Sequence, residues 1–259
     1  MIIEPIKISG TFDTRISAKG YCSRCDKVHG MVIGYSAQYA KGLLKILTEK
    51  KRIDLAVSDE EADPRFSTDY LFGKARGQMF GVLVCRDMDG NYGLLKAFSG
   101  QYNGVWNVDG WVPPLVDTDK LQSMSSGVER FIKHLGRKIE NAPDGSAERE
   151  ALVDKRKAIS QALMKDIHNL YKVPCICGDV QPLPEAVSGN GGMPTGIGDC
   201  CAPKLLGYAA RHSLTPLGLA EFYVGRENRS KTKRHGGMYS SCTDKCQRIL
   251  GYMLCGVCD

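Results

Sequence analysis

The sequence has no apolar run of about 18 residues, the length that a membrane-spanning helix requires. Its start, MIIEPIKISG, includes an acid and a proline and lacks the apolar core of a secretory signal. Charge of one sign is also in small excess, since 35 Lys and Arg against 29 Asp and Glu leave a net charge of +6. We therefore expect no membrane partner and a cytoplasmic, reducing setting. A nucleotide or RNA partner is compatible with this mild positive charge.

The length of 259 residues permits one large domain or two small ones, and we expect a single domain that spans residues 1–259. The hydrophobic content of 42% suits a globular protein. Residues 1–34 indicate short strands around a cysteine knuckle. Within residues 76–100, two apolar runs flank the sequence Asp-Met-Asp-Gly-Asn, which is typical of a β-hairpin turn. These features predict strands in the first half of the chain.

Residues 122–172 carry apolar side chains at helical spacing on both sides of a polar break. This pattern predicts an inserted αα-hairpin, with Ser125 or Ser126 capping its first helix. In residues 173–259, a glycine-rich segment precedes a helix, a buried strand and a second helix. We therefore expect an α/β (or α+β) fold with a central mixed sheet that is flanked by helices.

Ten of the eleven cysteines occur in close pairs, while Cys85 stands alone in an apolar strand and is expected in the core. The pairs are Cys22 with Cys25, Cys175 with Cys177, Cys200 with Cys201, Cys242 with Cys246, and Cys255 with Cys258. In a reducing setting, cysteines at such spacing bind metal more often than they form disulfides. Closely spaced thiolates suit Zn²⁺, because a tight turn directs two sulfurs at one tetrahedral centre.

Two of these pairs begin helices, and this arrangement predicts one catalytic-type zinc site. Cys200 or its neighbour Cys201 opens one helix, and Cys242 and Cys246 open the next. The N–H groups at a helix start favour a metal-bound thiolate. The order of hairpin, cysteine-led helix, strand and second cysteine-led helix resembles the zinc deaminase fold, in which a zinc-activated water attacks a base.

The resemblance to zinc deaminases has one departure. It implies a glutamate two residues after the first ligand, where it would move protons between the water and the leaving ammonia. This chain has Ala202 or Pro203 at that position. Asp199, beside the first cysteine, and Glu221, in the buried strand, are the carboxylates that could take its place.

The C-terminal third is also similar to another family. The segment GDCCAPKLLGYAARHSLTPLGLAEFYVG and the later SSCTDKCQRILGYML resemble the N-terminal extension of long bacterial RluA-like ribosomal pseudouridine synthases. The resemblance covers roughly residues 70–259 and stops before the catalytic domain of such a synthase. It therefore implies an association with RNA modification and no pseudouridine chemistry.

A second, structural Cys₄ site is expected where the two ends of the chain meet, with Cys22, Cys25, Cys255 and Cys258 as ligands. His29 is an alternative ligand, and Cys175 with Cys177 could replace either pair. Four thiolates also suit an iron–sulfur cluster, so the identity of the metal stays open.

A basic loop precedes the last cysteine-led helix and is a candidate for binding phosphate or nucleic acid. Its cations are Arg226, Arg229, Lys231, Lys233 and Arg234. His235 at its end could ligate the metal or act as a base. The rings of Tyr102, Trp106 and Trp111 are candidates for stacking bases, although such rings more often fasten a loop to a core.

These features predict a zinc-binding, deaminase-like protein that acts on a nucleotide or RNA base through a metal-activated water, with Glu221, Asp199 or His235 moving protons. The alternative is a catalytically silent zinc module that binds RNA or an RNA-modification enzyme. A third hypothesis is a thiol-redox or thiol-nucleophile enzyme that uses Cys200 and Cys201. The sequence leaves the oligomeric state open.

Overall fold

The computed structural model describes residues 2–257, which belong to two compact units. The first unit comprises residues 2–115, 173–181 and 186–257, and the second comprises residues 116–172 and 182–185. Groups of strands and groups of helices follow one another along the chain, and the predicted fold class, a sheet flanked by helices, is confirmed. No helix within the described part of the chain combines the length and apolar character needed to cross a membrane.

The central sheet of the first unit contains five strands. Their order is β1 (Glu4–Pro5), β5 (Tyr92–Phe98), β4 (Gln78–Arg86), β8 (Thr215–Val224) and β9 (Met238–Tyr239). The described pairings are all antiparallel, which corrects the mixed sheet expected from the sequence. The reason is that β5 and β8 run in the same direction but lie on either side of β4. The helical connection between them therefore creates no neighbouring parallel pair.

Alternate residues of β4 and β8 point to opposite faces of this sheet. On one face Phe80 lies opposite Phe222, with 6.0 Å between ring centroids, in the main hydrophobic core. Helix α1 (Ser36–Lys50) covers this face with the buried side chains of its apolar stripe, Ala40, Leu43 and Leu47. The core thus leaves the other face of β4 and β8 to the first cysteine-led helix.

Two of the rings considered for base stacking belong to this core instead. Tyr102 is completely buried, and its hydroxyl donates to the carbonyl of Ser67 at 2.8 Å. Trp111 is also buried, and its indole N–H donates to the carbonyl of Ile53 at 2.7 Å. Both rings fasten loops to the core, so neither is accessible to a nucleic acid.

Helix α5 (Cys201–Arg211) lies against the opposite face of the sheet. Its first residue approaches β4 so closely that a Cβ built on Gly81 would lie 2.8 Å from the Cβ of Cys201. Glycine at position 81 is therefore required for the start of α5 to reach the sheet. This contact positions the first cysteine-led helix over β4 and β8.

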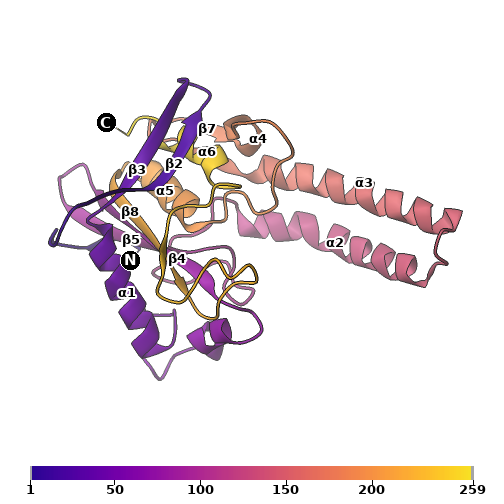
Figure 1. Cartoon of the computed structure of the whole chain (residues 1–259), viewed down its shortest axis with the longest axis horizontal. Coiled ribbons are helices and arrows are strands. Elements are labelled where there is room, and N and C mark those ends of the chain that lie inside the picture. The colour runs from indigo at the N-terminus through magenta and orange to yellow at the C-terminus, as the bar shows by residue number, and fades with distance from the viewer. Residues whose placement is uncertain (1, 258–259) are drawn as a thin grey trace. The chain divides into compact units, whose positions relative to one another are not determined.

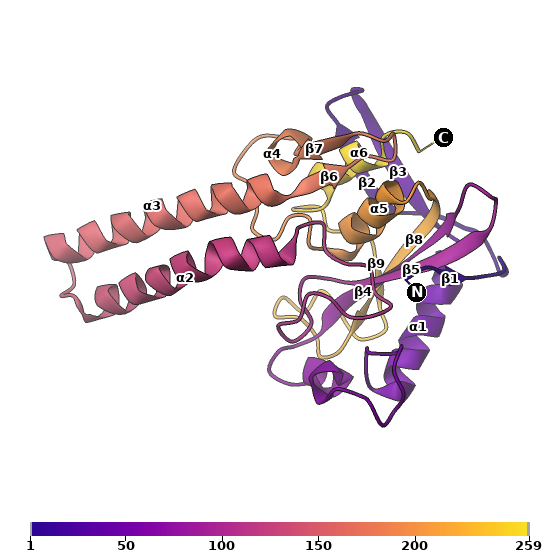
Figure 2. The same ribbon diagram turned by 180° about the vertical axis from the view of Figure 1, so that it is seen from behind.

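The N-terminal hairpin, β2 (Asp13–Cys22) and β3 (Lys27–Gly34), forms a separate two-stranded sheet. Helix α6 (Gln247–Leu254) lies along this hairpin in both views of Figures 1 and 2. The backbones of α6 and β2 are in direct contact, because a Cβ on Gly251 would lie 2.2 Å from the carbonyl carbon of Tyr21. The expected strands of residues 1–34 are therefore present and pack against the end of the chain.

The second unit is built on the expected helix pair, α2 (Thr118–Asn141) and α3 (Ala147–Leu170). Helix α2 begins earlier than predicted, because the side chain of Asp117 accepts hydrogen bonds from the N–H groups of Asp119 and Lys120. Ser125 lies inside this helix and is not its cap. Short elements complete the chain: the 3₁₀ helices η1 (Pro64–Phe66) and η2 (Thr68–Phe72), strands β6 (Lys172–Pro174) and β7 (Val180–Pro182), and helix α4 (Leu183–Ala186).

Candidate metal centre

Three cysteines that are distant in sequence meet where α5 and α6 begin. Cys200 is the N-cap residue of α5, and Cys246 is the N-cap residue of α6. Their sulfurs and that of Cys242 lie within 4.8 Å of one another, and the sulfurs of Cys242 and Cys246 are 3.2 Å apart. The structure therefore brings together the set that the sequence predicts, and we call it the trio.

The thiols of the trio are hydrogen-bonded to one another. Hydrogen bonding with the thiols of Cys200 and Cys246 lowers the pKa of Cys242, whose sulfur also accepts the backbone N–H of Cys246 at 3.3 Å. The contact with Cys242 raises the pKa of Cys200 to about 12. A divalent cation would replace these hydrogen bonds with metal–thiolate bonds. Three thiolates with an open fourth position fit a catalytic-type zinc site better than an iron–sulfur cluster, which takes four.

Glu221 brings a buried carboxylate to the first turn of α5. The residue is 4% exposed, and its Oε1 accepts a hydrogen bond from the N–H of Ala202 at 2.8 Å. Burial raises the pKa of this carboxyl to about 7, although the Ala202 N–H and the positive charge of Lys233 favour the ionised form. The partner of this carboxylate is thus the backbone at position 202. The carboxylate thus reaches the residue at which the deaminase resemblance expects a glutamate.

Cys201, the neighbour of the first ligand, lies outside the trio, which corrects its assignment as a metal ligand. Its sulfur points to the sheet and donates to the carbonyl of Met79 at 3.4 Å. Burial raises the pKa of this thiol well above its usual range. A thiol-nucleophile enzyme needs an accessible thiolate with a lowered pKa. The pair Cys200 and Cys201 does not provide one.

The other carboxylate and the histidine considered for proton transfer are placed differently. Asp199 precedes the trio directly, and its backbone carbonyl accepts the N–H of Gly100 at 2.7 Å. His235 is exposed, and its Nδ1 accepts the backbone N–H of Gly225 at 3.2 Å. Within residues 2–257 His235 belongs to no group of side chains that could hold a metal. Its position gives it a role in shaping the basic loop.

Lys204 is a buried cation near the trio, and the sequence did not predict its structural role. Lys204 is 1% exposed, and its Nζ donates to the carbonyls of Phe98 and Gly100 at 2.9 and 2.7 Å. Burial lowers the pKa of Lys204 to about 8. Its burial could have been predicted, because this lysine lies one helical turn after Cys200 on an otherwise apolar helix face. It ties α5 to the loop that also contacts Asp199.

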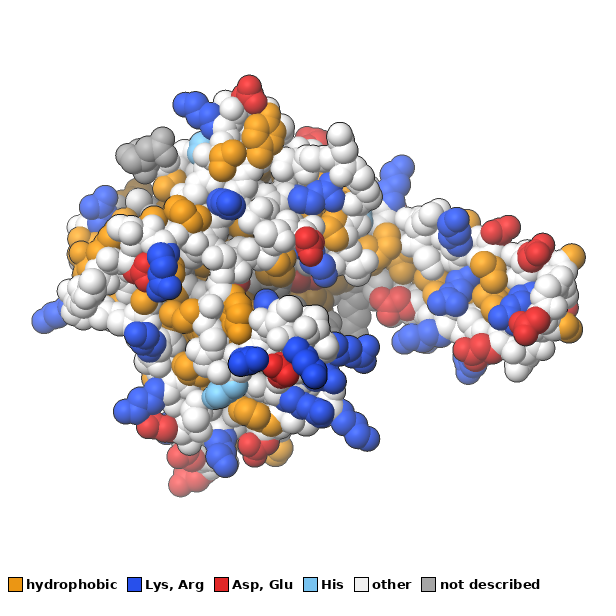
Figure 3. All heavy atoms as spheres, in the orientation of Figure 1, with side chains coloured by type: hydrophobic (Ala, Val, Ile, Leu, Met, Phe, Trp, Pro, Cys, Tyr) orange, Lys and Arg blue, Asp and Glu red, His pale blue; other side chains and the backbone are white. Residues whose placement is uncertain are grey.

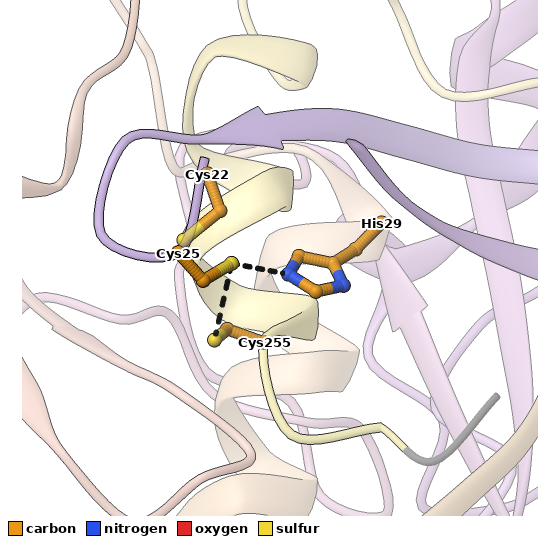
Figure 4. Close-up of side chains that lie close together, drawn as sticks. All are labelled: Cys22, Cys25, His29 and Cys255. Carbon is orange, nitrogen blue, oxygen red and sulfur yellow. Dashed lines mark hydrogen bonds between the residues drawn. The ribbon is translucent and has the colours of Figure 1, made fainter. Parts of the chain in front are cut away.

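A second group of possible ligands lies at the tip of the N-terminal hairpin (Figure 4). Atoms of Cys22, Cys25, His29 and Cys255 lie within 4.8 Å of one another. The sulfur of Cys25 is 3.0 Å from Nε2 of His29 and 3.9 Å from the sulfur of Cys255. Cys258, the fourth ligand expected from the sequence, lies outside the described residues, and His29 completes the group instead.

Cys175 and Cys177 form a disulfide, with 5.1 Å between their Cα atoms. The sequence leaves these two cysteines open as substitutes for either pair of the second site, and in the disulfide they are not free thiolates. The turn that joins β6 to β7 brings them together, since the N–H of Cys175 donates to Asp179 and that of Gly178 donates to Cys175. Their sulfurs and that of Cys255 lie within 4.8 Å of one another. The disulfide therefore borders the second group of ligands.

The basic loop is an ordered turn beside Glu221. The Asn228 side chain accepts the N–H groups of Thr232 and Lys233 at 2.9 and 3.0 Å, which fixes the path of the backbone. Arg226, Arg229, Lys231 and Arg234 are exposed, and Figure 3 shows Lys and Arg side chains gathered over this loop. Arg234 pairs with Glu227 at 3.3 Å. Most of the positive charge of the loop thus faces solvent.

A cavity of about 200 Å³ lies beside Glu221, at the edge of the sheet where β8 and β9 meet the N-terminal hairpin. Glu221, Tyr239 and Arg15 are among its lining residues. Sites that hold a whole drug-sized ligand usually measure about 300–1,000 Å³. The cavity is therefore suited to a small group rather than to a large ligand.

No protein-family model matches this sequence, and searches of curated proteins and of solved structures find no significant match.

Proposed function

We propose that this chain is a zinc-dependent, deaminase-like hydrolase that acts on a nucleotide or an RNA base. The proposal is carried by one observation, the hydrogen bond between Glu221 and the N–H of Ala202. This contact brings a carboxylate to the first turn of α5, which follows the potential zinc ligand Cys200. The sequence itself has alanine, and no carboxylate, at position 202. The chain thereby has both a metal-binding trio and a proton carrier.

The chemistry divides between the trio and Glu221. A zinc ion held by Cys200, Cys242 and Cys246 would supply a water molecule that loses a proton near neutral pH. The Glu221 carboxylate accepts that proton and returns it to the leaving amino group. An amino-bearing base and water are consumed, and the oxo-base and ammonia are released. A carboxyl pKa of about 7 suits both halves of this transfer at neutral pH.

The surroundings of Glu221 support a nucleotide or RNA substrate. The adjacent cavity has room for a planar ring, and the exposed cations of the basic loop can bind phosphate. Lys233, the half-buried cation of that loop, acts electrostatically on Glu221. A base bound beside Glu221 would therefore have its phosphate close to positive charge.

The direct experiment is ammonia release by the zinc-loaded full chain, assayed against cytidine, adenosine, guanosine and their nucleotides, and against bulk transfer RNA. We expect turnover on at least one of these substrates, with loss of turnover in Glu221→Gln. The exposed Glu49 of α1 provides the matched control, because Glu49→Gln should leave the rate unchanged. Zinc binding without ammonia release on the whole panel would refute the enzymatic proposal.

A second candidate function is a catalytically silent zinc module that binds RNA or an RNA-modification enzyme. The solvent-facing basic loop favours it, together with the sequence resemblance to the extension of the pseudouridine synthases. This function predicts RNA binding that weakens steeply with salt and no ammonia release. The substrate panel and a filter-binding titration with transfer RNA therefore separate the two functions.

A further inference from the structure

We propose that Cys22, Cys25, His29 and Cys255 form a second metal site, a structural zinc site that fastens the N-terminal hairpin to the end of helix α6. Cys22 ends β2, Cys25 lies in the turn, His29 lies in β3, and Cys255 is the C-cap residue of α6. Figure 4 shows the four side chains pointing toward one another from these elements. The inference is independent of the deaminase proposal, because it uses none of the trio.

The geometry of the four donors suits zinc. Ligands that lie about 2.3 Å from a tetrahedral zinc ion are separated from one another by roughly 3.8 Å. Here the Cys25 and Cys255 sulfurs are 3.9 Å apart, and all four ligand atoms lie within 4.8 Å of one another. Three thiolates and one imidazole form a closed Cys₃His set, which leaves no position for water. The site is therefore structural, unlike the open trio.

The turn that carries two of these ligands is held by its own hydrogen bonds. The N–H of Asp26, in the left-handed region with φ 58°, donates to the carbonyl of Cys22 at 2.9 Å. The hydroxyl of Tyr21 donates to the carboxylate of Asp26 at 2.6 Å, which holds the turn closed. Cys22 is completely buried, so its sulfur faces the interior rather than solvent. These contacts hold the turn that carries Cys22 and Cys25 next to the other two ligands.

The position of Cys255 explains what such a site would do. Helix α6 lies in backbone contact with β2 at Gly20 and Gly251, where no side chain can be added without displacing the helix. This contact joins α6 to the N-terminal hairpin, and within residues 2–257 no disulfide crosses it. A metal bound by Cys255 and the hairpin would fix the C-terminal end of α6, whose N-terminal end carries Cys246 of the trio.

The neighbouring Cys175 and Cys177 are the competing ligands. Their disulfide removes them as thiolates, and the Cys177 sulfur also contacts the guanidinium of Arg24 at 3.2 Å. Cys255 belongs both to the group with Cys22, Cys25 and His29 and to the group with Cys175 and Cys177. The metal site is therefore defined by the group with which Cys255 binds the ion. The structure assigns the fourth position to His29, because its Nε2 is 3.0 Å from the Cys25 sulfur.

The experiment measures zinc per chain in the full-length protein by elemental emission. We expect two ions in the unaltered chain and one in His29→Ala, while the exposed His134 of α2 provides the control, because His134→Ala keeps both ions. The Cys₄ variant His29→Cys should also keep both ions, and the cobalt-substituted form should show stronger thiolate-to-metal absorption. Proteolysis of residues 13–34 should accelerate in His29→Ala. This last result distinguishes a structural ion from an incidental one.

Several outcomes would overturn the proposal. One is the retention of both ions in His29→Ala, and another is an unchanged cobalt spectrum in His29→Cys. A third is the loss of the second ion in a Cys175→Ser/Cys177→Ser variant. The deaminase proposal is tested separately, because Cys242→Ser should remove only the ion of the trio. A chain that holds the hairpin ion but never releases ammonia would contradict the proposed function and leave this inference intact.

Discussion

The carboxylate of Glu221, in the middle of a sheet strand, accepts a hydrogen bond from the backbone N–H of Ala202 in the first turn of a helix, at 2.8 Å. The two residues belong to different elements, β8 and α5, and come together because Gly81 lets α5 approach the sheet. Position 202 is two residues after Cys200, a member of the trio. The contact therefore places a titratable group beside the three cysteines that could hold a metal ion, without requiring it in the local sequence.

Replacement of Glu221 by glutamine should abolish turnover while zinc binding is retained. The amide keeps the shape and the hydrogen bond to Ala202 but cannot carry a proton. General acid–base groups contribute roughly 10²–10⁴-fold to rates, so a loss of this size in kcat is expected. Measurement of kcat and zinc content in the same preparations checks this. An E221Q protein that turns over at the original rate would remove Glu221 from the mechanism.

Removal of cations from the basic loop should flatten the salt dependence of RNA binding. Arg229 and Lys231 are exposed, so each can contact phosphate. Each lost phosphate contact reduces the slope of log K against log salt by roughly one unit or less. Filter binding of transfer RNA to Arg229→Ala/Lys231→Ala, with the α2 substitution Lys133→Ala as control, measures the change. An equal slope in the parent chain, the double variant and the Lys133→Ala control would show that the loop does not bind RNA.

Substitution of Gly251 by alanine should destabilise the first unit. The added Cβ would lie 2.2 Å from the backbone of Tyr21, so α6 must move away from β2. Overpacking of this kind typically costs about 1–3 kcal/mol. Gly127→Ala in α2 is the matched control, since a Cβ there meets nothing within 4 Å and alanine favours the helix by roughly 1 kcal/mol. Chemical denaturation should move the two midpoints in opposite directions. Equal stability of Gly251→Ala and the parent chain would contradict the close contact.

The stability of the second unit, which contains α2 and α3, should fall in mild acid. His168 of α3 is 7% exposed, and burial lowers its pKa below the usual value of 6.5. Between the two pKa values the unfolded chain binds a proton that the folded chain excludes, so stability decreases as the pH falls below about 6.5. Thermal unfolding at pH 7.5 and 5.5 tests this, and His168→Gln should reduce the difference. An unfolding midpoint that stays constant or rises on acidification would contradict the direction of the shift.

The helices, the β4–β5 hairpin and the grouping of the cysteines could be predicted because they depend on local spacing. The trio follows from Cys200 and Cys246 standing at helix starts, which apolar periodicity locates. The choice between Cys200 and Cys201 could not be predicted. It depends on which side chain turns toward Gly81, and that is a property of the packed sheet.

Other features depended on contacts between distant segments. Trp111 and Tyr102 are buried because their polar atoms reach the carbonyls of Ile53 and Ser67, more than 30 residues away in sequence. The cap of α2 is Asp117, which follows a run that carries no helical signal, so the serines nearer the apolar pattern were a poorer choice. The antiparallel sheet followed from strand order, which periodicity along single segments does not encode.

The most direct test of the account is the zinc content of three single variants, Cys200→Ser, Cys242→Ser and Cys201→Ser. The first two alter the trio, while the third alters the adjacent cysteine, whose sulfur donates to Met79 instead. The account predicts that the first two proteins each lose one zinc ion per chain and that Cys201→Ser retains it. Retention of that ion in Cys242→Ser, or its loss in Cys201→Ser alone, would contradict the assignment of the metal centre.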